Sequence, residues 1–362
     1  MPYKNPYSWN TNANVFYIEQ PAGVGFSICP VASECSFDDQ NSADDNLLAL
    51  QSWFAKFPEY KNHEFYITGE SYGGIYIPFL AKRIIDYNKN AQEKINLKGF
   101  AIGNGVTDWK YDTTPACLEM GFYHGLIGWD VKEGLDSNDC YIDYEKDECK
   151  PFVDKFNKLI EDLNPYDVYD WHYKDMPVTN PDYARFMDER FKKGMRAKKD
   201  NGLLKANPGY GMDTYLNTQE FRDAFHIDST AGTWADCADI DYTILDAGSI
   251  DLYKNDFPGQ DLKILHYSGD TDCVVPTLGT LNWITAAQYT VTEEWAPWYT
   301  ADQQVAGYFQ GYQGLNFTTI HGTGHMVPQW KRVQAHQMIM NFLTGKNFNT
   351  TYTVSETEYA AA

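Results

Sequence analysis

The sequence predicts an α/β protein in which helices cover both faces of a mostly parallel central sheet. Short apolar runs of strand length alternate with amphipathic helical patterns over the first hundred residues, and again from about residue 209. Such strand–helix–strand units favour parallel strands joined by helical crossovers. The chain has 362 residues, of which 43% are hydrophobic and 22% are charged, as in an ordinary soluble globular protein.

Five segments account for the alternation in the first hundred residues. Leu47, Leu50 and Phe54 recur at helical spacing, and Pro58 ends that helix. A second helix carries a single apolar stripe over residues 77–85. The short apolar runs around these helices are expected to form the strands: Val15–Ile18, Phe65–Thr68 and Phe100–Ile102.

The segment from about 109 to 208 has a different composition. It is rich in Asp, Lys and Tyr and shows no apolar alternation of strand length, so we expect a helical insertion. Its basic run, Arg190 to Lys199, is interpreted either as a solvated helix or loop or as a proteolytic processing site. The alternation then returns with strands at Ile264–Tyr267 and Phe317–Ile320 and a last helix over 333–343. The expected organisation is a core of residues 1–108 and 209–345, the insertion at 109–208, and a disordered tail at 346–362.

The charge balance excludes several classes of partner. The formal net charge is −21, from 29 Lys+Arg and 50 Asp+Glu. A chain with this much negative charge repels phosphate backbones and anionic lipid head groups. Neither nucleic acid nor a membrane is therefore expected as a partner. No run approaches the roughly 18 consecutive apolar residues of a membrane helix. Because the sequence has no CxxC pair and no HExxH, a zinc site is not expected. No other metal or cofactor is expected either.

Seven cysteines and two glycosylation sequons favour an oxidising compartment. The sequons make Asn316 and Asn349 the candidate glycosylation sites. The N-terminal residues, however, lack the basic and apolar regions of a signal peptide. An odd number of cysteines and the lack of an export signal are inconsistent with a disulfide-bonded, exported protein.

The strongest chemical signal is the pentapeptide Gly69-Glu70-Ser71-Tyr72-Gly73. It matches G-x-S-x-G, follows an apolar strand and opens an amphipathic helix, as a nucleophile elbow requires. The glycines allow the tight turn that exposes the serine hydroxyl, and the helix N-terminus favours developing negative charge. Ser71 is therefore the candidate nucleophile.

A serine nucleophile needs a base, and the base needs an acid that orients it. In folds with such an elbow, the acid and then the histidine follow the serine along the chain. The acidic loop after the strand at 264–267 offers Asp270 and Asp272, and the glycine-rich loop after the last strand offers His321 and His325. Spacing alone leaves both choices open.

Taken in order, the motifs of this chain resemble those of the serine carboxypeptidase family. The resemblance implies an α/β-hydrolase fold whose helical cap is the insertion at 109–208. It also selects Asp272 as the acid and His325 as the base. The matching segments cover almost the whole chain: Asn5–Asn10, Gln20–Ser27, Gly69–Gly74, Gly103–Gly105, Tyr215–Asn217, Gly269–Asp272 and Gly322–Pro328.

The resemblance further implies release of C-terminal residues from peptides or proteins through an acyl-enzyme on Ser71, at acidic pH. The N–H of Tyr72 would contribute to the oxyanion hole, and Tyr72 and Met326 to substrate binding. Glu70 would help to bind the substrate carboxylate, which requires a shared proton. The implied location is the vacuole, the lysosome or the secreted fraction. The alternatives are an acyltransferase or esterase with the same triad, and a catalytically impaired remnant.

The chain departs from the family pattern at its N-terminus. Relatives carry a strand ending in Asn-Gly-Gly-Pro-Gly-Cys ahead of the region that matches Tyr3–Pro6. In the family that segment supplies the second oxyanion donor, an asparagine and a glutamate for carboxylate binding, and a cysteine that bonds to the one matching Cys237. The resemblance therefore implies an N-terminally truncated chain, whose missing strand would lie next to the one that carries Ser71. The oligomeric state stays open, with a homodimer among the alternatives.

Overall fold

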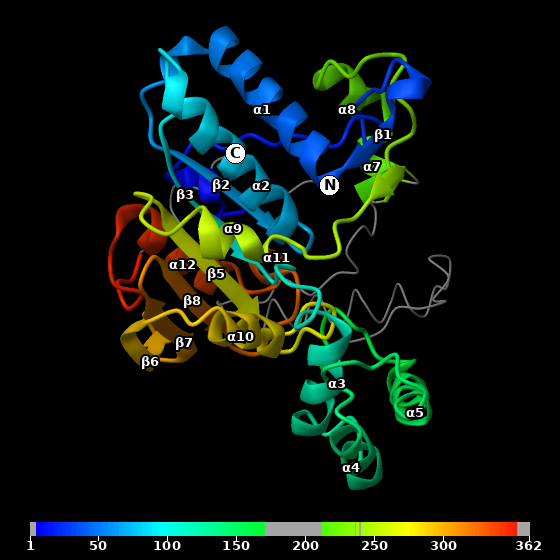
Figure 1. Cartoon of the computed structure of the whole chain (residues 1–362). Coiled ribbons are helices and arrows are strands. Elements are labelled where there is room, and N and C mark those ends of the chain that lie inside the picture. Colours follow the sequence, from blue (N-terminus) through cyan, green and yellow to red (C-terminus); the bar gives the residue numbers. More distant parts are fainter. Residues whose placement is uncertain (1–4, 171–211, 236, 239, 353–362) are drawn as a thin grey trace, which may run out of the picture.

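A computed structural model describes residues 5–170, 212–235, 237–238 and 240–352 (Figure 1). Its centre is a sheet with the spatial order β2-β3-β5-β8-β7-β6. The strands in that order are β2 (Phe65–Glu70), β3 (Leu97–Gly103), β5 (Lys263–Gly269), β8 (Leu315–Ile320), β7 (Val305–Tyr312) and β6 (Val291–Tyr299). The first four run parallel, and β7 and β6 continue the sheet as antiparallel strands. The mostly parallel sheet that the sequence predicts is confirmed.

Helices cover both faces of this sheet. Phe100 and Ile102 of β3 belong to a buried cluster with α2, α9 and α10, whereas Ala101 between them packs with α12 on the opposite face. Successive strand residues point to opposite faces, so the sheet is buried on both sides. The α-helices described in the core are α1 (Asp39–Lys56), α2 (Gly73–Asn90), α7 (Met212–Leu216), α8 (Gln219–Ala224), α9 (Ile250–Asn255), α10 (Thr277–Ala286), α11 (Val327–Trp330) and α12 (Arg332–Thr344).

Local sequence explains where the long helices begin and end. Asp38 caps α1 by accepting hydrogen bonds from the backbone N–H groups of Gln40 and Asn41, and Pro58 follows its end. α12 ends at Gly345, whose φ of 65° is the left-handed conformation that glycine adopts without strain. The helices expected around residues 47–57, 77–85 and 333–343 are all present. A second, two-stranded parallel sheet pairs β1 (Ser36–Asp38) with β4 (Asp241–Thr243).

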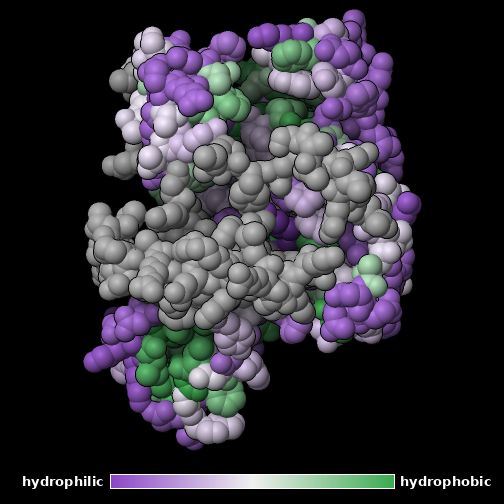
Figure 2. All heavy atoms as spheres, turned by 180° about the vertical axis from the view of Figure 1, so that it is seen from behind, coloured by the Kyte–Doolittle hydropathy of each residue, from purple (hydrophilic) through white to green (hydrophobic). Residues whose placement is uncertain are grey.

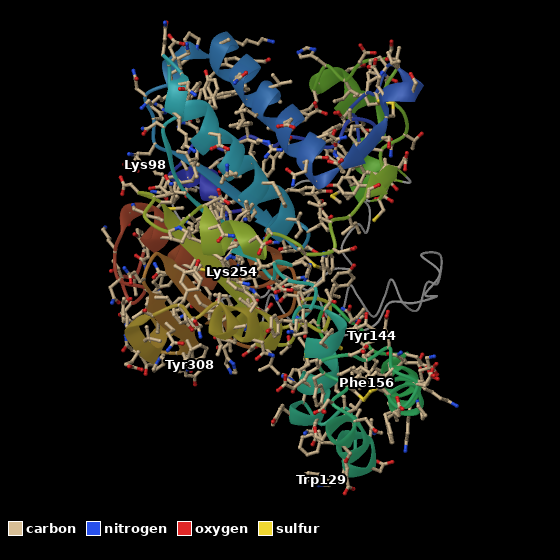
Figure 3. The ribbon with its side chains drawn as sticks, viewed as in Figure 1. Lys98, Trp129, Tyr144, Phe156, Lys254 and Tyr308 are labelled. Carbon is tan, nitrogen blue, oxygen red and sulfur yellow. A yellow bond between two sulfur atoms is a disulfide. The ribbon has the colours of Figure 1, made fainter. Side chains whose placement is uncertain are left out.

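Part of the predicted insertion forms a helical unit that stands apart from the sheet (Figure 1). Its described α-helices are α3 (Thr114–Tyr123), α4 (Trp129–Ser137) and α5 (Lys150–Ile160). They enclose a buried cluster of their own that includes Leu118, Val131 and Phe156. Figure 3 shows Trp129 at the end of this unit farthest from the sheet, where it is 74% exposed. The basic run at 190–199 lies outside the described residues.

Six of the seven cysteines form disulfide bonds. Cys29–Cys35 closes a short loop, Cys140–Cys149 closes another beside α4, and Cys117–Cys273 joins α3 to the loop after β5. Cys237 is a free, exposed thiol. The chain thus carries the disulfide bonds that its cysteine content predicted.

Two expectations about the ends of the chain were wrong. Val15–Ile18 forms no strand, because no described strand pairs with it. Val15, Tyr17 and Ile18 are exposed, while Phe16 stacks on Trp53 at 4.5 Å. The described part of the tail, residues 346–352, is not disordered. Phe348 is buried against Trp298 and Phe309, and its carbonyl accepts hydrogen bonds from Gln337 and Asn341. The rest of the tail lies outside the described residues.

The antiparallel hairpin of β6 and β7 was not predicted. β6 is an edge strand with nearly all residues exposed, and Glu293, Glu294 and Pro297 interrupt the alternation that marks a strand. Tyr308 lies on the outer surface of this hairpin (Figure 3). Within the described ranges, no helix has both the length and the apolar character needed to cross a membrane.

Candidate active site

Ser71 lies at a sharp turn between β2 and α2, as predicted. Its φ of 61° is strained for a non-glycine residue. The turn is held by hydrogen bonds from Ser71 N to the carbonyl of Gly103, and from the N–H groups of Gly74 and Val106 to the carbonyl of Ser71, all 3.0 Å long. Only glycine fits at position 74, because a Cβ there would lie 2.1 Å from the carbonyl oxygen of Val106. The backbone around the elbow is therefore fixed on both sides.

His325 and Asp272 form a buried pair at the carboxyl end of the same sheet. Nδ1 of His325 lies 2.6 Å from Oδ2 of Asp272, and the two side chains are 3% and 0% exposed. The backbone N–H groups of Val274 and Val275 also donate to the Asp272 carboxylate, at 2.8 and 3.0 Å. These bonds fix the orientation of the carboxylate, which in turn orients the imidazole.

Asn104 is a further site residue, to which the sequence analysis assigned no role. It follows β3 and its Nδ2 donates to Oδ2 of Asp272 at 3.0 Å, while its Oδ1 accepts from Gly269 N at 2.9 Å. It is 1% exposed, with φ at 37°. The sequence does contain a turn signal here, Gly103-Asn104-Gly105 after a strand. Such turns are too common to indicate what Asn104 does.

The four candidates for the acid and the base form two separate pairs, Asp270 with His321 and Asp272 with His325. Asp270 binds His321 at 2.8 Å and accepts from Gly322 N at 2.7 Å. The His321 side chain is 62% exposed. Asp272 and His325, by contrast, are enclosed beside the elbow. The buried pair is the one that the family resemblance selected, and its catalytic role stays a prediction.

Electrostatics connect the elbow to this pair. Burial raises the pKa of Glu70 to about 7, the positive charge of His325 lowers it, and the negative charge of Asp272 raises it. Burial lowers the pKa of His325, but the hydrogen bond to Asp272 and the charges of Asp272 and Glu70 outweigh it, so the pKa is raised above its usual value. The Ser71 hydroxyl makes no hydrogen bond to any described residue; serine–histidine contacts often tighten only with substrate bound.

Tyr72 follows the candidate nucleophile and combines a backbone N–H that is unpaired among the described residues with a hydroxyl that is held by a hydrogen bond. No described residue accepts a hydrogen bond from its N–H, which lies at the start of α2. Its hydroxyl donates to the buried Asp39 at 2.7 Å, and Asp39 also accepts from the Tyr242 hydroxyl at 2.7 Å. A free N–H at a helix N-terminus beside the candidate nucleophile is suited to stabilise an oxyanion.

A cavity of about 1550 Å³ lies along β2, and Glu70, Ser71 and Tyr72 are part of its wall. The remaining wall is mostly apolar and comes from the segment 9–20, from residues of and just before β2, and from side chains of α1, α2 and α12. Figure 2 shows apolar residues deep in the upper part of the molecule, between hydrophilic rims. In the described sheet β2 pairs with β3 alone, so its other edge is open. His325 and the half-buried Met326 that follows it are not part of this wall.

The two sequons lie in different settings. Asn316 is a half-buried residue inside β8, where it pairs with Leu265 on one side and Gly311 on the other. Asn349 is exposed, and its Oδ1 accepts a hydrogen bond from Tyr299 N at 2.8 Å. Of the two, Asn349 has the accessible position that a glycan needs.

Comparison with known proteins identifies the family. A family model described as serine carboxypeptidase matches residues 1–345. The chain belongs to the serine carboxypeptidase family. It is 33% identical to serine carboxypeptidase 24 of Arabidopsis thaliana over 97% of this chain and 76% of that protein. To serine carboxypeptidase 1 of Hordeum vulgare it is 31% identical, over 94% of this chain and 75% of that protein.

A solved structure supports the fold independently. A prohormone-processing carboxypeptidase from Saccharomyces cerevisiae matches with a TM-score of 0.71 and 19% sequence identity, over 97% of this chain and 79% of that one. The chain therefore has the α/β-hydrolase-like fold of a hydrolase family. It spans about three quarters of the length of its curated relatives.

Proposed function

We propose that this serine carboxypeptidase relative releases C-terminal residues from peptides through an acyl-enzyme intermediate. The observation that carries the proposal is that the strained elbow at Ser71 lies at the same carboxyl end of the sheet as the buried His325–Asp272 pair. A serine, an aspartate and a histidine in the loops that follow three strands of one parallel sheet are the arrangement that serine hydrolases of this topology use.

Each residue has a role in the reaction. Ser71 attacks the carbonyl carbon of the last peptide bond, while His325 takes the serine proton and then gives it to the leaving amine. Asp272 holds His325 in the required tautomer and stabilises the imidazolium. The N–H of Tyr72 donates to the oxyanion of the tetrahedral intermediate. Water then attacks the acyl-enzyme, with His325 again as the base, and releases the shortened peptide.

Glu70 is the residue proposed to bind the C-terminal carboxylate of the substrate. With a pKa of about 7, it is neutral at acidic pH and donates a hydrogen bond to the negatively charged substrate group. Above that pH it becomes a carboxylate and repels the substrate. We therefore expect KM for peptides to rise as the pH passes about 7, and an acidic working pH. The disulfide bonds support an oxidising location, vacuolar, lysosomal or extracellular.

The test compares an N-blocked dipeptide with the same dipeptide carrying a C-terminal amide. We expect release of the last residue from the free acid, much slower turnover of the amide, and loss of at least about 10³-fold in Ser71→Ala. Ser137→Ala, at the exposed end of α4, is the matched control and retains activity. Hydrolysis of esters alone would indicate the esterase alternative, and labelling by a fluorophosphonate without turnover would indicate an impaired enzyme. Unchanged activity in Ser71→Ala would refute the nucleophile.

A further inference from the structure

A short segment at the base of the cap, residues 165–168, crosses both loops that carry the candidate acid and base. Three backbone hydrogen bonds attach it to them. They run from Cys273 N to the Pro165 carbonyl (2.9 Å), from His325 N to the Tyr166 carbonyl (2.7 Å), and from Val168 N to the Thr271 carbonyl (3.0 Å). The segment therefore contacts the loop after β5 and the loop after β8 together.

Asp167 extends this connection through its side chain. The residue is 1% exposed. Its Oδ1 accepts a hydrogen bond from the Thr271 hydroxyl at 2.7 Å and from Tyr169 N at 3.2 Å, and its Oδ2 accepts from Gly324 N at 3.1 Å. Thr271 immediately precedes Asp272, and Gly324 immediately precedes His325. A single carboxylate thus binds the residue next to the acid and the residue next to the base.

The packing leaves this arrangement little freedom. A Cβ at Gly324 would lie 1.8 Å from the carbonyl oxygen of Tyr166 and 2.6 Å from Cβ of Asp167, so glycine alone permits the approach. Thr271 N also donates to the Thr323 carbonyl at 3.0 Å, which joins the two loops directly. The ring of Tyr166 stands edge-on to His325, with centroids 5.3 Å apart. The spacing of the acid and base loops is therefore set by the segment that lies across them.

We propose that Asp167 is a positioning residue that holds the Asp272 and His325 loops in the register their hydrogen bond requires. This inference rests on the catalytic roles proposed above. Through Asp167 the base of the cap becomes part of the support of the catalytic pair, and the Cys117–Cys273 disulfide joins the cap to the same loop. Supporting contacts of this kind keep His325 at the place from which it can accept the proton of Ser71.

A carboxylate suits this place better than an amide. Two of the donors converge on Oδ1 and a third on Oδ2. An asparagine has one acceptor oxygen, so in either orientation its NH₂ group faces a backbone N–H, of Tyr169 or of Gly324. Asp167→Asn therefore keeps the shape of the side chain but loses one backbone contact.

The experiment measures kcat, KM, thermal unfolding, fluorophosphonate labelling of Ser71 and the deshielded proton NMR signal of the His325–Asp272 hydrogen bond. In Asp167→Asn we expect kcat and the labelling rate to fall about 10–100-fold with KM within threefold of wild type. The NMR signal should shift or broaden. Thr271→Val, which removes one donor, should reduce kcat less.

Asp270→Asn is the matched control, because Asp270 also accepts a backbone hydrogen bond, from Gly322, in the same pair of loops. It removes the same charge while leaving Thr271 and Gly324 untouched, and should leave kcat, the labelling rate and the NMR signal within twofold of wild type. If Asp167→Asn folds and matches Asp270→Asn in all of these measurements, the positioning role is wrong. If Asp167→Asn fails to fold, the decision passes to Thr271→Val: a normal NMR signal and normal labelling there would overturn the proposal.

These outcomes are separate from those of the proposed function. The proposed function fails if the wild-type chain releases no C-terminal residue, whereas labelling and the NMR signal report on the catalytic pair whatever the substrate is.

Discussion

At the scale of single residues, the site combines groups that a motif reveals with groups that only the fold brings together. Ser71 could be predicted because strand, turn and helix lie next to each other in the sequence. Asn104 and Asp167 could not, because their partners lie 168 and 157 residues away. Spacing also left Asp270 and Asp272 equivalent, since the difference between them is burial, which depends on the loops packed around them.

Glu70 provides the first prediction. Its folded pKa of about 7 lies above the ordinary value of 4.5, so folding favours the neutral form. The stability it contributes is complete below about pH 4.5 and is lost as the pH rises through about 7. We expect the free energy of unfolding of the wild type, relative to Glu70→Gln, to fall by on the order of 3 kcal/mol between pH 4.5 and 8.

Chemical denaturation at a series of pH values measures this difference. Glu148→Gln, which removes an exposed carboxylate of the cap, is the control for the loss of one negative charge. If Glu70→Gln behaves in the same way, Glu70 is not an acid that the fold keeps neutral, and its proposed role in carboxylate binding loses its basis.

At the scale of elements, prediction succeeded where one periodicity runs uninterrupted. α2 and α12 carry clear apolar stripes, and β3, β5 and β8 are apolar runs of strand length. β6 was missed because an exposed edge strand has no apolar face to detect. The opposite error, at Val15–Ile18, shows that an apolar run becomes a strand only where a neighbouring strand supplies hydrogen bonds.

The start of α2 provides the second prediction. An added methyl group in Gly74→Ala would meet backbone atoms of Val106, which cannot rotate away. We expect a loss of about 1–3 kcal/mol of stability, as for other overpacked sites. Because Val106 N donates to the Ser71 carbonyl, labelling of Ser71 by a fluorophosphonate should also slow. Gly232→Ala, where a Cβ meets nothing within 4 Å, should change neither quantity. Equal unfolding midpoints for the two variants would contradict this account of the elbow.

At the scale of the whole molecule, the sheet brings distant segments together at the carboxyl ends of its parallel strands. Candidate acid, base and nucleophile follow β5, β8 and β2, and Asn104 follows β3 between them. The sequence predicted the parallel sheet but not the order of its strands, which depends on how the helical crossovers pack. The open edge of β2 beside the apolar cavity is likewise a property of the assembled fold.

The Cys117–Cys273 disulfide links the cap to the core across 156 residues, whereas Cys140–Cys149 spans only 9. Closing a longer loop removes more entropy from the unfolded chain, and the chain-entropy relation gives about 5 kcal/mol for the first and about 2.5 kcal/mol for the second. We therefore expect the Cys117→Ser/Cys273→Ser variant to lose about twice as much stability as Cys140→Ser/Cys149→Ser, measured by chemical denaturation. All four cysteines are buried, so the second variant is a matched control for the loss of sulfur packing. Equal losses would mean that local packing, and not the connection between cap and core, determines what each disulfide contributes.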